Sequence, residues 1–180
     1  RRLNLDKVGN GNIWTERIVL DLKNWLKPGH HKRLWNVGPP GLLVSLLLIY
    51  ATIQYEKVFN IKGYKMGETW FVILFLLVLF EAIFILFWVL FSLPPKHRGK
   101  SLCKNGIYSF VRHPIYTVVI FHIIVLSSLW VGSFLLLFLI PLQYLLWSKM
   151  VVREEEYLIG IFGQEYIDYM SNVSRFIPWK

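Results

Sequence analysis

The pattern of hydrophobic and polar positions along the chain predicts membrane-spanning helices. The clearest apolar run covers residues 69–93 and holds one charged side chain, Glu81. A weaker run covers residues 41–59 and follows Gly38-Pro39-Pro40. Because about 20 apolar residues cross the core of a bilayer, each run is long enough to form one span.

A third apolar stretch, residues 113–148, contains no Asp, Glu, Lys or Arg. As a single helix it would be about 54 Å long, against a bilayer core of about 30 Å. Serine and glycine residues within 127–133 favour a turn in its middle. The stretch therefore predicts two short spans, residues 114–130 and 132–150, and the whole chain is expected to be an all-α membrane bundle of four helices.

The basic residues predict the orientation of this bundle. Of the 20 Lys and Arg residues, all but three lie in the N-terminal segment, in the loop 94–113 or after residue 148. The remaining three lie in the loop between the first two spans. By the positive-inside rule, both termini and the middle loop face the cytosol. We expect a multi-pass integral membrane protein whose active site is also cytosolic.

The predicted membrane bundle covers residues 39–152, and a polar segment flanks it on each side. In the first segment, residues 1–38, apolar side chains recur at helical spacing within residues 13–27, with Lys and Arg on the other face. That pattern is typical of an interfacial helix, and a helix packed against a cytosolic domain is equally compatible with it. Residues 153–180 are expected to form cytosolic helices.

Composition and charge narrow the class of protein. Hydrophobic residues make up 55% of the 180 residues and charged residues 17%, whereas soluble domains have about 25% charged residues. This argues against a soluble globule. The single cysteine, Cys103, forms neither an internal disulfide nor a multi-cysteine metal site, and no metal is expected. The charges behind the net +9 flank apolar runs, so we expect contact with lipid and none with nucleic acid.

Two sequence blocks carry the candidate chemistry. The first, Asn105 to Tyr116, leads into the third span. Pro114 suits the first turn of a helix, which places Arg112 and His113 beside the unpaired N–H groups of that turn. Such a junction suits an anion, either a carboxylate or a phosphate. A basic anchor at the lipid headgroups is the simpler alternative.

The second block, Arg153-Glu154-Glu155-Glu156, follows the fourth span. Successive helical residues point about 100° apart, so the three carboxylates face different directions. One or two of them can then face a cationic ligand while the others stay solvated. A fully solvated charged face is the alternative.

Three polar residues lie inside the predicted spans: Glu81, His122 and Gln143. A carboxylate in the middle of a span costs about 2.5–3.5 kcal/mol, so Glu81 should face the bundle and have a partner. Counted from the cytosolic ends, His122 and Gln143 lie at similar depth and Glu81 about one turn deeper. We expect the three to bind the polar end of a substrate or, alternatively, to hydrogen-bond between helices.

Taken together, the two blocks resemble the isoprenylcysteine carboxyl methyltransferase family and its phospholipid methyltransferase relatives. The similarity covers residues 100–178. It rests on Gly106-x-Tyr108, Arg112-His113-Pro114-x-Tyr116, Glu154-Glu155-x-x-Leu158-x-x-x-Phe162-Gly163-x-x-Tyr166-x-x-Tyr169 and Val173-x-Arg175-x-Ile177-Pro178. The resemblance implies a membrane methyltransferase that uses S-adenosylmethionine and acts on a lipophilic acceptor entering from the bilayer.

The same resemblance implies roles for individual residues. The cofactor is expected to contact a group of residues in the first block: Gly106, Tyr108, Arg112, His113, Pro114 and Tyr116. Glu154 and Glu155, with the adjacent Arg153, are expected near the reacting centre, and the C-terminal helices are expected to complete the cofactor site.

The chain departs from the family pattern in two places. Val118 stands where the family usually has glycine. Lys149 and Met150 occupy the window in which the prenylcysteine enzymes have an arginine, and lysine does not replace the two-pronged grip of arginine on a carboxylate. On the residues alone, this slightly favours an amine or thiol acceptor, with a glutamate as the base, over a carboxylate acceptor.

Two other readings of the sequence remain. A sterol C14-reductase-like enzyme would use NADPH in a related fold, but it would need a larger bundle than this chain provides. A non-enzymatic scaffold or small transporter would use Glu81 and His122 as a proton or ion relay.

Overall fold

The computed structural model describes residues 37–93 and 101–179. Within these ranges the chain is helical, and extended backbone pairs only at an isolated parallel bridge between Val111 and Ser174. The amphipathic helix expected at residues 13–27 lies outside the described residues.

Four helical stretches of the described chain are long and apolar enough to cross a membrane: Gly38–Val58, Glu68–Ser92, Pro114–Val131 and Phe134–Phe162. The first two are the continuous helices α3 (Gly38–Val58) and α4 (Glu68–Ser92). Prolines in the first turn of α3 remove N–H groups that have no partner within the helix, so they cost no hydrogen bond there. The expected all-α bundle of four spans is confirmed, and its cytosolic orientation stays a prediction.

The third span is not a regular α-helix. It starts as α5 (Pro114–Thr117), continues as the π-helical segment η3 (Val118–Ile123) and ends as α6 (Ile124–Val131). Gly132 then takes a left-handed conformation with φ of 73°. Because residues with a side chain adopt that conformation poorly, glycine suits this turn between the third and fourth spans.

The fourth span begins with the short helix α7 (Phe134–Leu137) and continues as α8 (Leu139–Phe162). The sequence predicted that this span ends at residue 150, but α8 runs on for three more turns and ends at Gly163. The glutamates of the second block therefore lie on the same rigid helix as the span. A shorter helix, α9 (Gln164–Asn172), follows.

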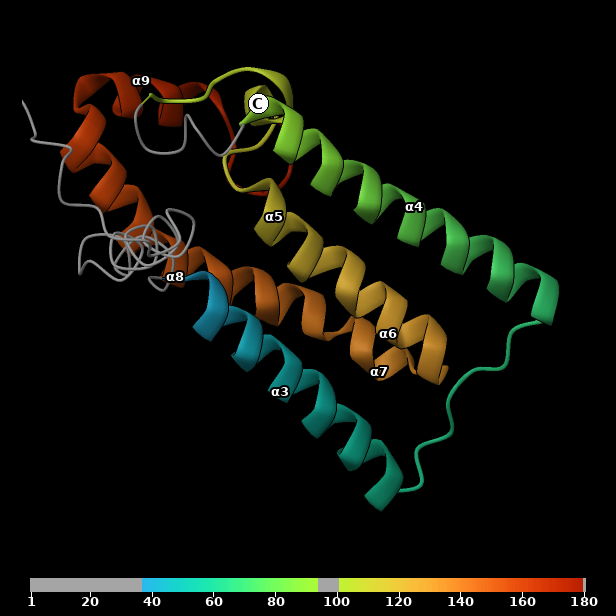
Figure 1. Ribbon diagram of the computed structural model, residues 1–180. Helices are drawn as coiled ribbons and strands as arrows, with labels where there is room; N and C mark the ends of the chain where they lie inside the picture. Colours follow the sequence, from blue (N-terminus) through green and yellow to red (C-terminus); the bar gives the residue numbers. More distant parts are fainter. Residues whose placement is uncertain (1–36, 94–100, 180) are drawn as a thin grey trace, which may run out of the picture. The chain divides into compact units, whose positions relative to one another are not determined.

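The helices pack in pairs around small apolar clusters, and Figure 1 shows α3 beside α8 and α4 beside α5 and α6. Between α3 and α8 the approach is close, because a Cβ added at Gly41 would lie 2.6 Å from the ring of Trp147. A second cluster joins Val89 of α4 to Ile107 and Val111. It fixes the end of α4 against the segment that carries the first sequence block.

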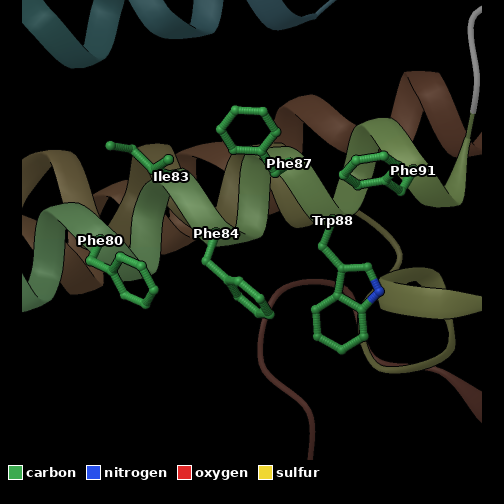
Figure 2. Close-up of a pocket in the computed structure, with 6 residues that line it drawn as sticks. All are labelled: Phe80, Ile83, Phe84, Phe87, Trp88 and Phe91. Carbon is green, nitrogen blue, oxygen red and sulfur yellow. The ribbon is translucent and has the colours of Figure 1, made fainter.

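One face of α4 carries a row of exposed aromatic side chains. Figure 2 shows six apolar residues of this helix that line a shallow groove of about 460 Å³: Phe80, Ile83, Phe84, Phe87, Trp88 and Phe91. Large apolar side chains that are exposed on a spanning helix are typical of a surface covered by lipid.

Candidate active site

The last residues of the described chain hold the first sequence block in place. The backbone N–H groups of Arg112 and His113 donate hydrogen bonds to the carbonyl oxygens of Ser174 and Arg175, at 2.9 and 3.0 Å. Together with the bridge between Val111 and Ser174, these bonds align two segments that lie far apart in the sequence. The C-terminal segment thus brings Arg175 to the same place as Arg112 and His113.

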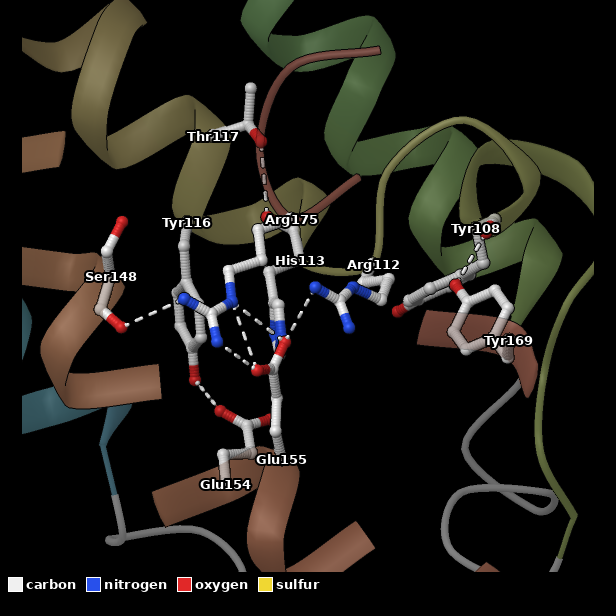
Figure 3. Close-up of polar contacts among 10 residues, drawn as sticks. All are labelled: Tyr108, Arg112, His113, Tyr116, Thr117, Ser148, Glu154, Glu155, Tyr169 and Arg175. Carbon is white, nitrogen blue, oxygen red and sulfur yellow. Dashed lines mark hydrogen bonds and ion pairs between the residues drawn. The ribbon is translucent and has the colours of Figure 1, made fainter. Parts of the chain in front are cut away.

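Glu155 is the centre of this arrangement, as Figure 3 shows. Arg175 donates from Nη2 to Oε2 at 2.7 Å and from Nε to both carboxylate oxygens, at 3.0 and 3.2 Å. Nη2 of Arg112 lies 3.2 Å from Oε1, and Nε2 of His113 lies 3.3 Å from the same oxygen. The Glu155 side chain is only 3% exposed.

These contacts determine what Glu155 can do. Two guanidinium groups and an imidazole surround one buried carboxylate, and this environment strongly favours its ionised form. Both carboxylate oxygens are already engaged, so neither is available to take a proton from a substrate. The geometry indicates that Glu155 orients Arg112, His113 and Arg175.

Glu154, the neighbouring residue, is half-buried and faces a different group. The Tyr116 hydroxyl donates to its Oε2 at 2.8 Å. The Tyr116 ring stacks on His113, with ring centroids 5.5 Å apart, and packs against Trp147 at 4.4 Å. Because its ring is fixed on both sides, Tyr116 fixes the direction of the Glu154 carboxylate.

A pocket of about 170 Å³ lies beside these residues. Its walls come from the end of α4, from the segment before α5, and from α8 and α9: Leu93, Ser101, Leu102, Cys103, Tyr108, Arg112, His113, Glu154, Leu158, Phe162, Tyr166 and Tyr169. It combines an arginine, a glutamate and several aromatic rings in one small space.

Arg112 is the unusual member of this pocket. Its side chain is 8% exposed, and one nitrogen, Nη2, pairs with Glu155. The other two guanidinium nitrogens, Nε and Nη1, are buried and have no hydrogen-bond partner among the described residues. Buried donors without a partner cost about 1–3 kcal/mol each, so their presence points to a ligand that accepts from them.

Two tyrosines of α9 close the pocket on another side. The Tyr169 hydroxyl donates to the backbone carbonyl of Tyr108 at 2.6 Å, and Tyr166 is buried against it. Burial raises the pKa of both hydroxyls above the ordinary value for tyrosine, so both stay protonated near neutral pH.

The residues predicted to bind the cofactor do not all lie in this pocket. Tyr108, Arg112 and His113 line it. Tyr116 is not among the lining residues, but its hydroxyl donates a hydrogen bond to Glu154, which is. Gly106 instead packs against α4, and its φ is 62°. A Cβ at this position would lie 2.2 Å from the Ser92 hydroxyl, so only glycine fits here.

Two further predicted residues also lie outside the pocket wall. Pro114 is the buried first residue of α5, as its sequence position predicted. Arg153 is exposed on α8, whereas Arg112 and Arg175, the arginine partners of Glu155, come from other segments.

The three polar residues inside the spans fall into two separate places. Oε2 of Glu81 on α4 lies 3.6 Å from Nε2 of His122, although the Glu81 side chain is 59% exposed. Gln143 is fully buried on α8, where its Oε1 accepts a hydrogen bond from the Ser45 hydroxyl at 2.8 Å. Trp147 donates to the same hydroxyl at 3.1 Å.

The sequence interpretation gave no role to two residues of this site, Arg175 and Tyr166. Arg175 belongs to the last sequence element of the family resemblance, and that membership was the one available signal. Tyr166, a buried aromatic residue on α9, belongs to the second block of that resemblance, three residues after Phe162-Gly163, and this membership was likewise its available signal.

Comparison with known proteins places this site in a family context. A model of the isoprenylcysteine carboxyl methyltransferase family matches residues 71–160, half of the chain. A protein-S-isoprenylcysteine O-methyltransferase of Saccharomyces cerevisiae is 36% identical over 93 residues, which are 47% of this chain and 35% of that protein. A protein of the same name from Schizosaccharomyces pombe is 36% identical over 87 residues, 46% of this chain and 35% of that protein. The match thus covers about a third of the length of these relatives.

Proposed function

The chain belongs to the isoprenylcysteine carboxyl methyltransferase family, and on that premise we propose that it transfers a methyl group from S-adenosylmethionine to the carboxylate of a lipophilic, isoprenylcysteine-like acceptor. The observation that carries this proposal concerns Arg112, whose buried Nε and Nη1 find no acceptor within residues 37–93 and 101–179. It lies at a pocket that also holds Glu154. The pocket is built from the segments that resemble the family.

The residues of the pocket fit the proposed donor. The amino-acid end of S-adenosylmethionine carries one carboxylate and one ammonium group. Nε and Nη1 of Arg112, which have no partner in the part of the chain that the structure describes, can donate to the carboxylate, and Glu154 supplies a negative charge for the ammonium. Tyr108 and Tyr166 offer aromatic faces on which the adenine ring of S-adenosylmethionine can stack.

When bound, the donor supplies a methyl group that its sulfonium sulfur has already activated. The protein therefore has to align the acceptor with that methyl group and to keep water away. Glu155 positions Arg112 by pairing with one side of its guanidinium, which leaves the other side directed at the ligand. Tyr116 positions Glu154 in the same way.

A carboxylate is the acceptor that this site suits best. A carboxylate nucleophile needs no base at neutral pH, whereas an amine or a thiol has to lose a proton. Glu155 is a poor base, because Arg112, His113 and Arg175 occupy both its oxygens. The weak preference for an amine or thiol rests on a glutamate that acts as the base, and in the structure Arg112 and Arg175 engage Glu155 instead. The names of the two yeast relatives also favour oxygen methylation.

The position of the pocket suits an acceptor that arrives from the bilayer. It lies at the end of α4 and beside the start of α5, where two spanning helices leave the apolar region. We propose that the lipid part of the acceptor stays in the membrane while its polar end reaches the pocket. By the distribution of basic residues, this end of the bundle faces the cytosol.

Binding of S-adenosylhomocysteine, the demethylated donor, tests the assignment of the pocket. Isothermal titration calorimetry on the purified chain in detergent should show saturable binding. Arg112→Lys keeps a positive charge beside Glu155 but loses the donors of the guanidinium fork, so the dissociation constant should rise at least about tenfold. Lys57→Arg, an exposed and charge-conserving change at the far end of α3, is the matched control.

The melting temperatures of both variants should stay close to that of the original chain. If Arg112→Lys binds the ligand as tightly as Lys57→Arg does, the Arg112 guanidinium does not hold the carboxylate of S-adenosylmethionine and the proposed site is wrong.

A further inference from the structure

Cys103 is the one cysteine of the chain, and the structure places it in the wall of the candidate donor pocket. It is half-buried, so a small molecule that enters the pocket can reach it. Its thiol donates to the backbone carbonyl of Ser92 at 3.2 Å. Because Ser92 is the last residue of α4, the sulfur is held against the end of a spanning helix.

A second observation, the unpartnered guanidinium nitrogens of Arg112, points to a ligand in the space beside this sulfur. Arg112 lines the same pocket, and its Nε and Nη1 atoms are buried without a partner among the described residues. In Figure 3 the guanidinium of Arg112 lies between Glu155 and the rings of Tyr108 and Tyr169. Since all of these except Glu155 line the pocket with Cys103, a molecule bound to Arg112 would also occupy the space beside the thiol.

From this juxtaposition we propose that Cys103 is a covalent modification site. A small, soft electrophile that reacts with its thiol blocks the binding of the methyl donor in the pocket. The inference rests on the proposed function, because it takes the pocket as the binding place of S-adenosylmethionine. A maleimide is a suitable probe of this chemical class. The sulfur forms a bond to one alkene carbon, the π bond of the alkene breaks, and the other alkene carbon takes up a proton to replace the one that the thiol releases.

The size of the pocket explains why such an adduct excludes the donor. N-ethylmaleimide leaves a five-membered ring and an ethyl group on the sulfur, inside a pocket of about 170 Å³. Buried Tyr166 and Tyr169 line the same pocket, and closely packed side chains yield little space to added atoms. The adduct and the amino-acid end of the donor therefore compete for one space.

Alkylation of the purified full chain by N-ethylmaleimide tests the proposal in both directions. Intact-mass spectrometry should show a single adduct, and a saturating concentration of S-adenosylhomocysteine should slow its formation at least about tenfold. Conversely, the alkylated chain should bind S-adenosylhomocysteine at least about tenfold more weakly than the untreated chain does in calorimetry.

A relocated cysteine provides the matched control. The double variant Cys103→Ser, Gly160→Cys moves the thiol to an exposed position on α8, where a Cβ at Gly160 meets no atom within 4 Å. It should be alkylated once, at a rate that S-adenosylhomocysteine does not change, and its affinity for this ligand should be the same before and after alkylation.

The outcomes separate this inference from the function on which it rests. If the untreated chain does not bind S-adenosylhomocysteine, both proposals fall. If it binds the ligand but alkylation of Cys103 is not slowed by it, or leaves its affinity unchanged, the proposed function stands and the modification site is wrong.

Discussion

Replacement of Glu155 by glutamine probes the buried charge cluster directly. Glutamine has nearly the same shape but no charge, so the two guanidinium groups and His113 lose the carboxylate that holds them together. The side chain of Arg112 is 8% exposed and that of Arg175 is 31% exposed. Water can therefore replace few of the lost carboxylate contacts at Arg112 and more of those at Arg175.

The size of the effect follows from this burial. Removing one partner of a buried ion pair costs about 3–5 kcal/mol, and the partial exposure of Arg175 places the expected cost at the lower end, about 3 kcal/mol. In a chain of this size, 1 kcal/mol shifts the melting temperature by about 2–4 °C. Glu155→Gln should therefore lower the melting temperature by about 6–12 °C.

Thermal unfolding in detergent, followed by tryptophan fluorescence, measures this shift. Glu156→Gln is the matched control, because Glu156 is the next residue on α8 and is exposed. An exposed ion pair between adjacent turns of a helix contributes about 0.3–0.5 kcal/mol, so this variant should melt within about 2 °C of the original chain. Equal melting temperatures for the two variants would refute the idea that Glu155 organises the site.

Kinetics of the same variant distinguish a positioning residue from a base. Because Glu155 holds Arg112, its loss should raise the Michaelis constant for the donor at every pH, with a fall in kcat/KM of at least about tenfold. A loss confined to kcat that shrinks as the pH rises would mean that Glu155 takes a proton from the acceptor.

Three other substitutions test separate parts of the site. His113→Ala should weaken the binding of S-adenosylhomocysteine about tenfold while the protein stays folded, and an unchanged affinity in calorimetry would remove His113 from the donor site. Tyr116→Phe removes the 2.8 Å hydrogen bond to Glu154, which should reduce donor affinity about fivefold, equivalent to about 1 kcal/mol. If titration shows no difference, Tyr116 does not set the direction of that carboxylate. Glu81→Gln keeps a polar contact with His122 and removes a charge from the spanning region, so the yield of folded protein should hold or rise and donor affinity should not change. Complete loss of turnover in this variant, with normal folding and donor binding, would place the reaction deeper in the membrane.

Much of the fold followed from local sequence properties. Long apolar runs located the spans, and the prolines at residues 39 and 114 located two helix starts, because each effect acts within a few residues. The sequence predicts a fourth span that ends at residue 150 and separate helices from residue 153 onward, whereas the structure joins both parts into one helix, α8. Glu, Arg and Lys are good helix formers, and the helix ends only at Gly163, where φ is 57°.

The candidate site was harder to predict, because its key contacts join distant segments. Adjacent residues such as Arg112 and His113 could be assigned to one place from the sequence. Arg175 could not, since it reaches Glu155 only after the C-terminal segment pairs with Val111 and its neighbours. Single-sequence patterns contain no information on such a pairing. The same holds for the π-helical segment at Val118–Ile123, whose apolar sequence suits an ordinary α-helix equally well.

The most direct test of the proposed function is a methyl-transfer assay with the purified full chain. The reaction contains S-adenosylmethionine labelled in its methyl group and an N-acetylated S-farnesylcysteine as the lipophilic carboxylate acceptor. The account predicts labelled product that releases its label as methanol on mild alkaline treatment, because a carboxyl methyl ester is hydrolysed whereas methyl groups on nitrogen or sulfur are not. It also predicts that Arg112→Lys lowers the rate at subsaturating donor at least about tenfold. No transfer by a chain that binds the donor, or label that resists alkali, would contradict carboxyl methylation.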